Sequence, residues 1–175
     1  DELSSANAHG EVLDVDHARH RTGAPGDPLP DDHRKRSAIG HILSLARHIP
    51  AGNASLAQGQ WKRSSFTGTE LFEKTLGIIG LGRIGGLVAE RAKAFGMRLV
   101  GYDPYITQAR AAQMGVEVLD LPGLLAVSDF VTVHMPKTPE TTGLISRERI
   151  AMMKPHAVLI NVSRGPVIDD DALID

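Results

Sequence analysis

Three glycines and one aspartate are the residues whose spacing points most clearly to chemistry. Gly80, Gly82 and Gly85 form the pattern G-x-G-x-x-G in TLGIIGLGRIGG, and Asp103 follows the next apolar run, RLVGY. Each glycine answers a separate need. Gly80 permits a tight turn, Gly82 lets a ligand approach the backbone, and Gly85 lets a helix pack closely on a strand.

The start of the following helix and Asp103 complete the pattern. Free backbone N–H groups around Arg83 and Ile84, at the positive end of the helix dipole, favour a phosphate. Asp103 is placed to accept hydrogen bonds from ribose hydroxyls, and its charge would repel a 2′-phosphate. The sequence therefore predicts a dinucleotide site that prefers NAD over NADP. The simpler alternatives are a turn begun by Asp103 before Pro104 and a solvated helix-start cation at Arg83.

Two further strand ends carry polar side chains. FVTVH ends in His134, and AVLINV runs into SRGPVID, where Arg164 precedes Gly165 and Pro166. Ligands of open α/β sheets bind beyond the carboxyl ends of the strands, so we expect Arg164 to hold a carboxylate and polarise a carbonyl group. An arginine that only caps the strand edge is the alternative. His134 has no visible carboxylate partner and is interpreted as structural.

Short apolar runs alternate with helical patterns and would position these residues. The expected strands are 75–80, 98–102, 116–119, 130–134 and 157–162. The expected helices are 83–95, 108–114, 121–129, 146–154 and one that starts at 169. Such βαβ units predict an α/β fold, a doubly wound parallel sheet of the Rossmann type. The pattern holds five strands, and the chain ends where a sixth is expected.

The chain divides into three parts. Residues 1–36 hold scattered acids, closely spaced prolines and half of the eight histidines without a sustained period, so we expect a disordered or unrelated tail. Residues 37–74 should form a packing helix over Ser37–Ile49, ended by Pro50, followed by a short helix and a connecting loop. Residues 75–175 are the predicted dinucleotide-binding domain, incomplete at its C-terminus.

The composition argues against several classes of binding partner. A chain of 175 residues with 42 % hydrophobic residues and a net charge of −2 has no basic field for nucleic acid or an anionic membrane. The chain contains no cysteine, and the histidine spacings match no familiar ligand pattern, so no metal site is predicted. No apolar run reaches the roughly 18 residues of a membrane helix. We expect a small-molecule substrate and a cytoplasmic location.

Together these motifs resemble a known family. EKTLGIIGLGRIG, YDPY, SDFVTVHMPKTPETTGLIS and LINVSRGPVIDDDAL occur in the order and spacing of the D-isomer-specific 2-hydroxyacid dehydrogenases. The resemblance implies hydride transfer between NAD and C2 of a D-2-hydroxy acid, with 3-phosphoglycerate expected and glyoxylate or hydroxypyruvate as alternatives. An NAD-sensing corepressor of the C-terminal-binding type and an NAD-binding regulatory fragment stay open.

The resemblance also implies roles for the site residues. The matching positions are Arg164 for the catalytic arginine that binds substrate, Arg83 and Ile84 for the pyrophosphate pair, Asp103 for the ribose acid, and Met135, Val162, Ser163 and Arg164 for the nicotinamide end. The family's Glu–His proton-transfer pair and N-terminal substrate domain have no counterpart, and RGP replaces RGG. We therefore expect this chain alone to be inactive, and its parent to be a homo-oligomer with the Ser37–Ile49 helix at the dimer interface.

Overall fold

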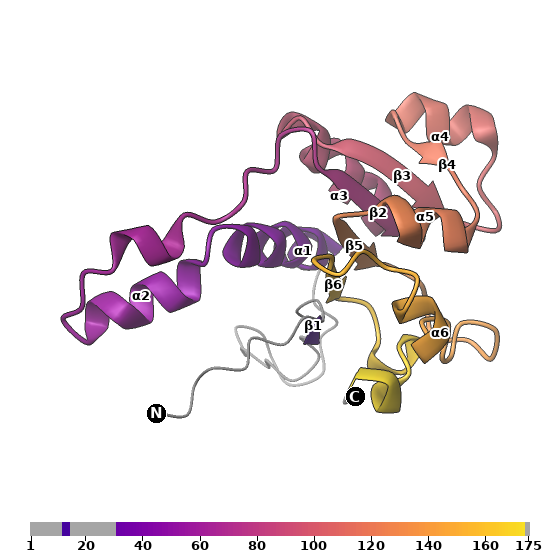
Figure 1. The fold of residues 1–175 in the computed structure, drawn as a ribbon. Helices are drawn as coiled ribbons and strands as arrows, with labels where there is room; N and C mark the ends of the chain where they lie inside the picture. The colour runs from indigo at the N-terminus through magenta and orange to yellow at the C-terminus, as the bar shows by residue number, and fades with distance from the viewer. Residues whose placement is uncertain (1–11, 15–30, 174–175) are drawn as a thin grey trace, which may run out of the picture.

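One parallel sheet organises the chain (Figure 1) in a computed structural model that describes residues 12–14 and 31–173. Its strands are β1 (Val12–Asp14), β2 (Thr75–Ile79), β3 (Arg98–Tyr102), β4 (Glu117–Val118), β5 (Phe130–Val133) and β6 (Val158–Asn161). They pair in the order β1–β6–β5–β2–β3–β4, and every pair is parallel. The predicted α/β fold with a Rossmann-type sheet is confirmed, and all five expected strands are present.

The strands form where the sequence places uninterrupted apolar runs. Every residue of β2 and of β5 is buried, as expected of parallel strands covered on both faces. The register pairs Ile79 of β2 with Tyr102 of β3 and with Val133 of β5, and pairs Val133 with Asn161 of β6. The loops that follow these four strands therefore leave the sheet at the same edge.

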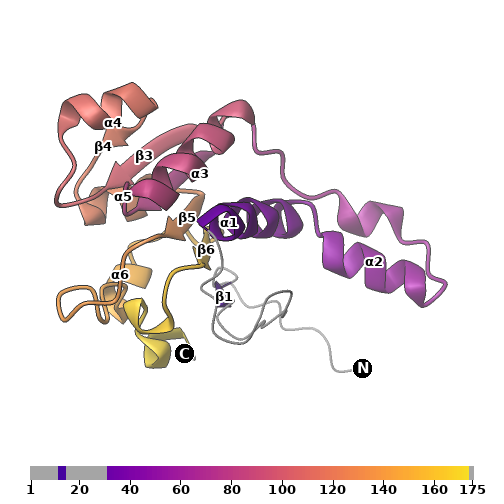
Figure 2. The ribbon, with the colours of Figure 1, turned by 180° about the vertical axis from the view of Figure 1, so that it is seen from behind.

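Helices cover both faces of the sheet. α1 (Asp31–Ala46), α3 (Arg83–Ala94) and α4 (Gln108–Met114) contribute to one apolar cluster, and α5 (Leu121–Val127) and α6 (Arg147–Ile150) to the other. Ile78 and Ile79, neighbours in β2, belong to different clusters because side chains alternate along a strand. α1 and α3 lie side by side in both views (Figures 1 and 2).

The first helices differ from the sequence expectation. α1 begins at Asp31, before the expected start at Ser37, and α2 (Ile49–Ala57) follows it. The break falls at His48, whose φ of 52° is left-handed and cannot continue a helix. Pro50 lies in the first turn of α2, where its missing N–H leaves no intrahelical bond unmade. Pro50 thus begins a helix, and the prediction that it ends one is wrong.

Part of the N-terminal region joins the sheet. β1 pairs with Leu159–Asn161 and so covers the edge of β6, whose N–H and C=O groups would otherwise lack strand partners. The expectation of a tail over 1–36 does not hold for this strand or for 31–36, which belong to α1. Residues 1–11 and 15–30 lie outside the described part of the chain.

The described residues also form three short 3₁₀ helices, Arg63–Phe66, Gly165–Val167 and Asp170–Leu173. The first lies in the expected connecting loop, and the second follows Arg164. α6 and the third are shorter than the helices expected at 146–154 and from 169 onward.

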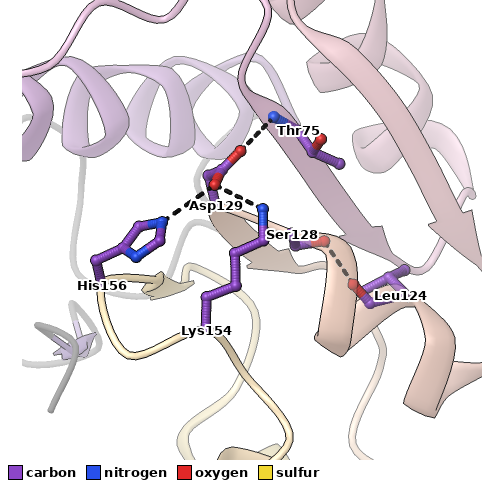
Figure 3. Close-up of polar contacts among 6 residues, drawn as sticks. All are labelled: Thr75, Leu124, Ser128, Asp129, Lys154 and His156. Atoms are coloured by element: carbon purple, nitrogen blue, oxygen red, sulfur yellow. Dashed lines mark hydrogen bonds and ion pairs between the residues drawn. The ribbon is translucent and has the colours of Figure 1, made fainter.

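Asp129 ties three segments together at the amino ends of the strands (Figure 3). Its Oδ2 accepts a hydrogen bond from the Thr75 N–H at 2.8 Å, and its Oδ1 accepts one from Lys154 Nζ at 2.8 Å and lies 3.3 Å from His156 Nε2. Burial raises the pKa of the Asp129 carboxyl, but the bonds from Lys154, Thr75 and His156 together lower it below its ordinary value. This network fixes the edge opposite the predicted site.

Candidate cofactor site

The glycine motif forms the turn between β2 and α3. Gly80 has a φ of 94°, which side chains disfavour, and a Cβ there would lie 3.0 Å from the His134 backbone. A Cβ on Gly85 would collide with the Gly80 carbonyl oxygen, so α3 packs directly on the turn. Apart from Gly82 itself and its two chain neighbours, no described residue has an atom within 4 Å of the Cβ position there. The fold itself requires Gly80 and Gly85, whereas Gly82 leaves room for an outside group.

Asp103 holds this turn in place. Its Oδ2 accepts a hydrogen bond from the Leu81 N–H at 2.8 Å, and its Oδ1 accepts one from the Tyr105 N–H at 2.9 Å. The bond to Tyr105 is the turn-forming role that the sequence left as an alternative, and the bond to Leu81 was not anticipated. A carboxylate oxygen can accept more than one hydrogen bond, so the half-buried Asp103 can also accept from a ribose hydroxyl.

The amino end of α3 has no side-chain cap. Gly82 is the N-cap residue, and it has no side-chain atom that could accept from the N–H groups of the first turn. The N–H groups of the first turn belong to Arg83, Ile84 and Gly85, which directly follow Gly82. An uncapped helix start beside open space fits a phosphate group.

A cavity of about 360 Å³ lies beyond the carboxyl ends of β5 and β6. The predicted residues in its lining are Ile84, Met135, Val162, Ser163 and Arg164. The remaining lining residues, which the sequence analysis did not assign to a cofactor or substrate, are Arg34, His134, Pro136 and Lys137. The predicted residues Gly80, Gly82, Arg83, Gly85 and Asp103 form the adjoining turn and do not line the cavity. Gly80 connects the glycine turn to the cavity lining, because its Cβ position lies 3.0 Å from Met135 Sδ.

Asn161, which the sequence analysis missed, fixes the turn that carries Arg164. Asn161 is 2 % exposed. Its Oδ1 accepts from the Ser163 N–H at 3.0 Å and from Ser163 Oγ at 2.8 Å, and its Nδ2 donates to the Arg164 carbonyl at 3.0 Å. One amide therefore bonds both sides of the turn. A polar residue that ends the apolar run AVLINV was the signal that could have identified it.

Arg164 is exposed at the cavity, and its backbone is extended. Its Nη1 donates to the Ser163 carbonyl at 2.7 Å, and within the described residues its guanidinium has no carboxylate partner. Pro166 lies in the first turn of the 3₁₀ helix that follows, and its carbonyl accepts from the Gly143 N–H at 2.9 Å. The charge of Arg164 is thus left available to an anion.

His134 forms part of the cavity wall as an uncharged group. Burial lowers the pKa of its imidazole from 6.5 to about 4, and its Nε2 lies 3.0 Å from Thr132 Oγ1. Its backbone N–H donates to the Ile79 carbonyl at 2.7 Å. These contacts support the structural interpretation of His134.

The described residues contain no group of three or more His, Cys, Asp or Glu side chains arranged to hold a metal ion. The early histidines His9, His17 and His20 lie outside the described residues. None of the described helices is long and apolar enough to cross a membrane.

Comparison with known proteins identifies the family of this chain. Residues 39–175 match the D-isomer specific 2-hydroxyacid dehydrogenase family, NAD binding domain. The chain belongs to this family. It is 55 % identical over 138 residues to D-3-phosphoglycerate dehydrogenase of Mycobacterium bovis, a match that covers 79 % of this chain and 26 % of the relative. The chain thus spans about a quarter of the length of the curated relatives it matches.

Solved structures agree with the family assignment. The apo-structure of D-lactate dehydrogenase from Escherichia coli matches with a TM-score of 0.79 at 35 % identity, covering 84 % of this chain and 46 % of that one. D-lactate dehydrogenase from Aquifex aeolicus, complexed with NAD and lactic acid, matches with a TM-score of 0.78 at 35 % identity, covering 82 % and 43 %. The family resemblance and the prediction of NAD as cofactor are confirmed.

Proposed function

We propose that this chain is the NAD-binding part of an NAD-dependent dehydrogenase that oxidises D-3-phosphoglycerate to 3-phosphohydroxypyruvate, the entry to serine synthesis. The observation that carries the proposal is the continuity of the glycine turn with the cavity that Arg164 lines. The names of the relatives, at 55 % identity, support phosphoglycerate over other hydroxy acids. Lactate dehydrogenases among the structural neighbours share the reaction class and make lactate the second candidate.

At the turn, the proposal assigns the cofactor pyrophosphate to the uncapped N–H groups near Arg83 and Ile84. Gly82 leaves the space that this approach requires. Asp103 accepts hydrogen bonds from the ribose hydroxyls while its bonds to backbone N–H groups keep it in position. Its negative charge disfavours a 2′-phosphate, which makes NAD the preferred dinucleotide.

In the cavity, the proposal places the nicotinamide end against Met135, Val162 and Ser163. NAD, when bound, supplies the hydride acceptor. Arg164 binds the substrate carboxylate with two parallel hydrogen bonds and so fixes C2 beside the cofactor, and its positive charge polarises the carbonyl that forms there. Asn161 holds the backbone of Arg164 and is a positioning residue.

Removal of the hydroxyl proton requires a base whose pKa lies near the working pH. His134 is a poor candidate because the pKa of its imidazole is about 4. We therefore propose that the proton acceptor belongs to a part of the whole enzyme that these residues do not include. The isolated chain should bind cofactor without turning over substrate.

We also propose that the whole enzyme is a homo-oligomer that uses the arm formed by α2 and the loop after it. Figure 1 shows this arm extending away from the sheet. Its exposed apolar side chains include Ile49, Leu56 and Trp61, of which Trp61 is 78 % exposed. Large apolar side chains that are exposed in one segment are typical of an interface. A cytoplasmic location stays a prediction from the composition.

Steady-state assays of the full-length protein test the proposed function. We expect NADH formation with D-3-phosphoglycerate at a higher kcat/KM than with D-lactate or D-glycerate, and a loss of at least about a hundredfold in Arg164→Gln. Arg149→Gln, a change outside the cavity, is the control. A higher kcat/KM with D-lactate would refute the substrate assignment, and full activity of Arg164→Gln would refute the role of the arginine.

A further inference from the structure

His134 has one ring nitrogen that the fold uses and one that the fold leaves over. Its Nε2 lies 3.0 Å from Thr132 Oγ1, whereas its Nδ1 has no hydrogen-bond partner among the described residues. In that part of the chain, every fully buried side-chain nitrogen or oxygen has a partner, so Nδ1 is accessible. His134 lines the cavity beyond β5 and β6, and Nδ1 is therefore open to that cavity.

The contact with Thr132 decides which ring nitrogen carries the proton. Thr132 is 0 % exposed, and its hydroxyl has no other hydrogen-bond partner within the described residues. If Nε2 carried the proton, the buried hydroxyl hydrogen would have no acceptor, which is costly. The hydroxyl therefore donates to Nε2. Because burial lowers the pKa of the imidazole to about 4, the ring is neutral at pH 7 and holds its single proton on Nδ1.

The cavity lining offers this Nδ1–H group no free side-chain acceptor. The lining cations, which can only donate, are Arg34, Lys137 and Arg164, and the apolar lining residues are Ile84, Met135, Pro136 and Val162. The hydroxyl among the described lining residues, Ser163 Oγ, is bonded to Asn161 Oδ1 at 2.8 Å. A ligand in the cavity that carries an acceptor oxygen would therefore satisfy the His134 donor.

His134 lies between the glycine turn and the cavity. A Cβ on Gly80 would lie 3.0 Å from the backbone carbonyl carbon and oxygen of His134, whose side chain lines the cavity. The His134 N–H donates to the Ile79 carbonyl at 2.7 Å, which fixes this backbone to the end of β2. In the proposed function the pyrophosphate lies at the turn and the nicotinamide in the cavity. The ribose that joins these two groups must therefore pass His134.

We propose that the Nδ1–H group of His134 donates a hydrogen bond to a hydroxyl oxygen of the nicotinamide ribose and so orients the nicotinamide ring in the cavity. The inference rests on the proposed function, since it takes the occupant of the cavity to be NAD. Thr132 is a positioning residue, because its hydroxyl keeps the proton on Nδ1. A fixed donor of this kind orders the ligand without adding a charge beside the reacting ring.

Calorimetric titration of this chain with ADP, ADP-ribose and NADH isolates the contribution of the ribose. ADP lacks the nicotinamide ribose, ADP-ribose adds it, and NADH adds the nicotinamide. We expect His134→Leu to bind ADP as wild type does and to bind ADP-ribose and NADH about three- to tenfold more weakly, the effect of one hydrogen bond. Thr132→Val should weaken the same two ligands by a smaller factor.

Two further variants serve as rescue and control. His134→Asn should recover most of the lost affinity, because its amide nitrogen is as many bonds from the backbone as Nδ1 and can donate in its place. A residue with a merely structural role would not show a loss that depends on the ribose. The matched control is His156→Leu, outside the cavity lining and at the opposite edge of the sheet, which should bind all three ligands as wild type does.

Several results would overturn the role of His134. Unchanged binding of NADH and ADP-ribose by a folded His134→Leu would do so, and an equal loss with ADP would show that the change only distorts the glycine turn. A loss with NADH alone would assign the bond to the nicotinamide carboxamide and refute the ribose. If His134→Leu does not fold, Thr132→Val decides, and unchanged binding of ADP-ribose by that variant refutes the inference. No saturable NADH binding by the folded wild-type chain would instead refute the proposed function itself.

Discussion

Replacing Asn161 by alanine should destabilise the turn that presents Arg164. The change leaves the Ser163 N–H, Ser163 Oγ and the Arg164 carbonyl without the partners that the amide provides at 2.8–3.0 Å. A buried polar group without a partner costs roughly 1–3 kcal/mol, and the hydroxyl can rotate toward another acceptor. We therefore expect the free energy of unfolding to fall by about 2–4 kcal/mol.

Asn161→Asp separates the two halves of this interaction. An aspartate keeps the acceptor for Ser163 but, when ionised, presents an oxygen to the Arg164 carbonyl where the amide donates. The variant should be less stable than wild type at pH 7 and should recover part of the loss at low pH, where a protonated carboxyl can donate. Burial and the missing donor both favour the protonated form, which raises the pKa of the new group above about 4.

Urea unfolding followed by circular dichroism measures both effects. Asn53→Ala, a change at an exposed position of α2, is the control and should alter stability by less than about 0.5 kcal/mol. Equal stabilities of Asn161→Ala and Asn53→Ala would refute the positioning role of the amide. Isothermal titration with NADH adds a functional readout, since a disordered turn should also weaken cofactor binding.

The remaining predictions concern the glycine turn and the opposite edge of the sheet. Gly85→Ala should lower the Tm sharply, because its Cβ would collide with the Gly80 carbonyl oxygen. Gly82→Ala should keep the wild-type Tm and weaken NADH binding about tenfold or more. The reverse pattern in calorimetry and NADH titration would refute the proposed division of roles between the two glycines. Asp129→Asn keeps an acceptor for the Thr75 N–H but loses the charge that faces Lys154, so the Tm at pH 7 should fall by roughly 2–4 °C. The pKa of Asp129 is lowered in the folded state, so the charged carboxylate stabilises the fold at pH values above the unfolded pKa of about 4. This stabilisation is lost as the pH falls through the folded pKa. A Tm difference between wild type and Asp129→Asn that grows on acidification would contradict this pH dependence.

The strands and the glycine turn could be predicted because their signals are local. An apolar run such as TLGII is long enough to define a buried strand, and the spacing of Gly80, Gly82 and Gly85 defines the turn that follows it. The sequence also predicted that Arg164 and Ile84 lie at the same edge of the sheet, because parallel strands bring their carboxyl ends together.

The parts that the sequence did not reveal depend on contacts between distant segments. Arg34 lies in a polar stretch with no apolar period, and only the packing of α1 on α3 brings it to the cavity. Asn161 looks like an ordinary polar residue until its hydrogen bonds to Ser163 and Arg164 are known, and Lys137 does so until the lining of the cavity is known. The break before α2 depends on the left-handed backbone of His48, which the presence of Pro50 in the sequence did not predict. Local sequence patterns therefore predicted the strands and the glycine turn, whereas tertiary packing determines which other residues line the cavity.

Binding of NADH and NADPH to this chain tests the central claim most directly. The single tryptophan, Trp61, lies on the exposed arm, so the emission of the reduced nicotinamide is the better signal. We predict saturable NADH binding, NADPH binding at least about tenfold weaker, and a smaller difference between the two in Asp103→Asn, which removes the charge that repels a 2′-phosphate. Equal affinities of the wild-type chain for the two dinucleotides, or no saturable binding by a folded sample, would contradict the account of the glycine turn and Asp103.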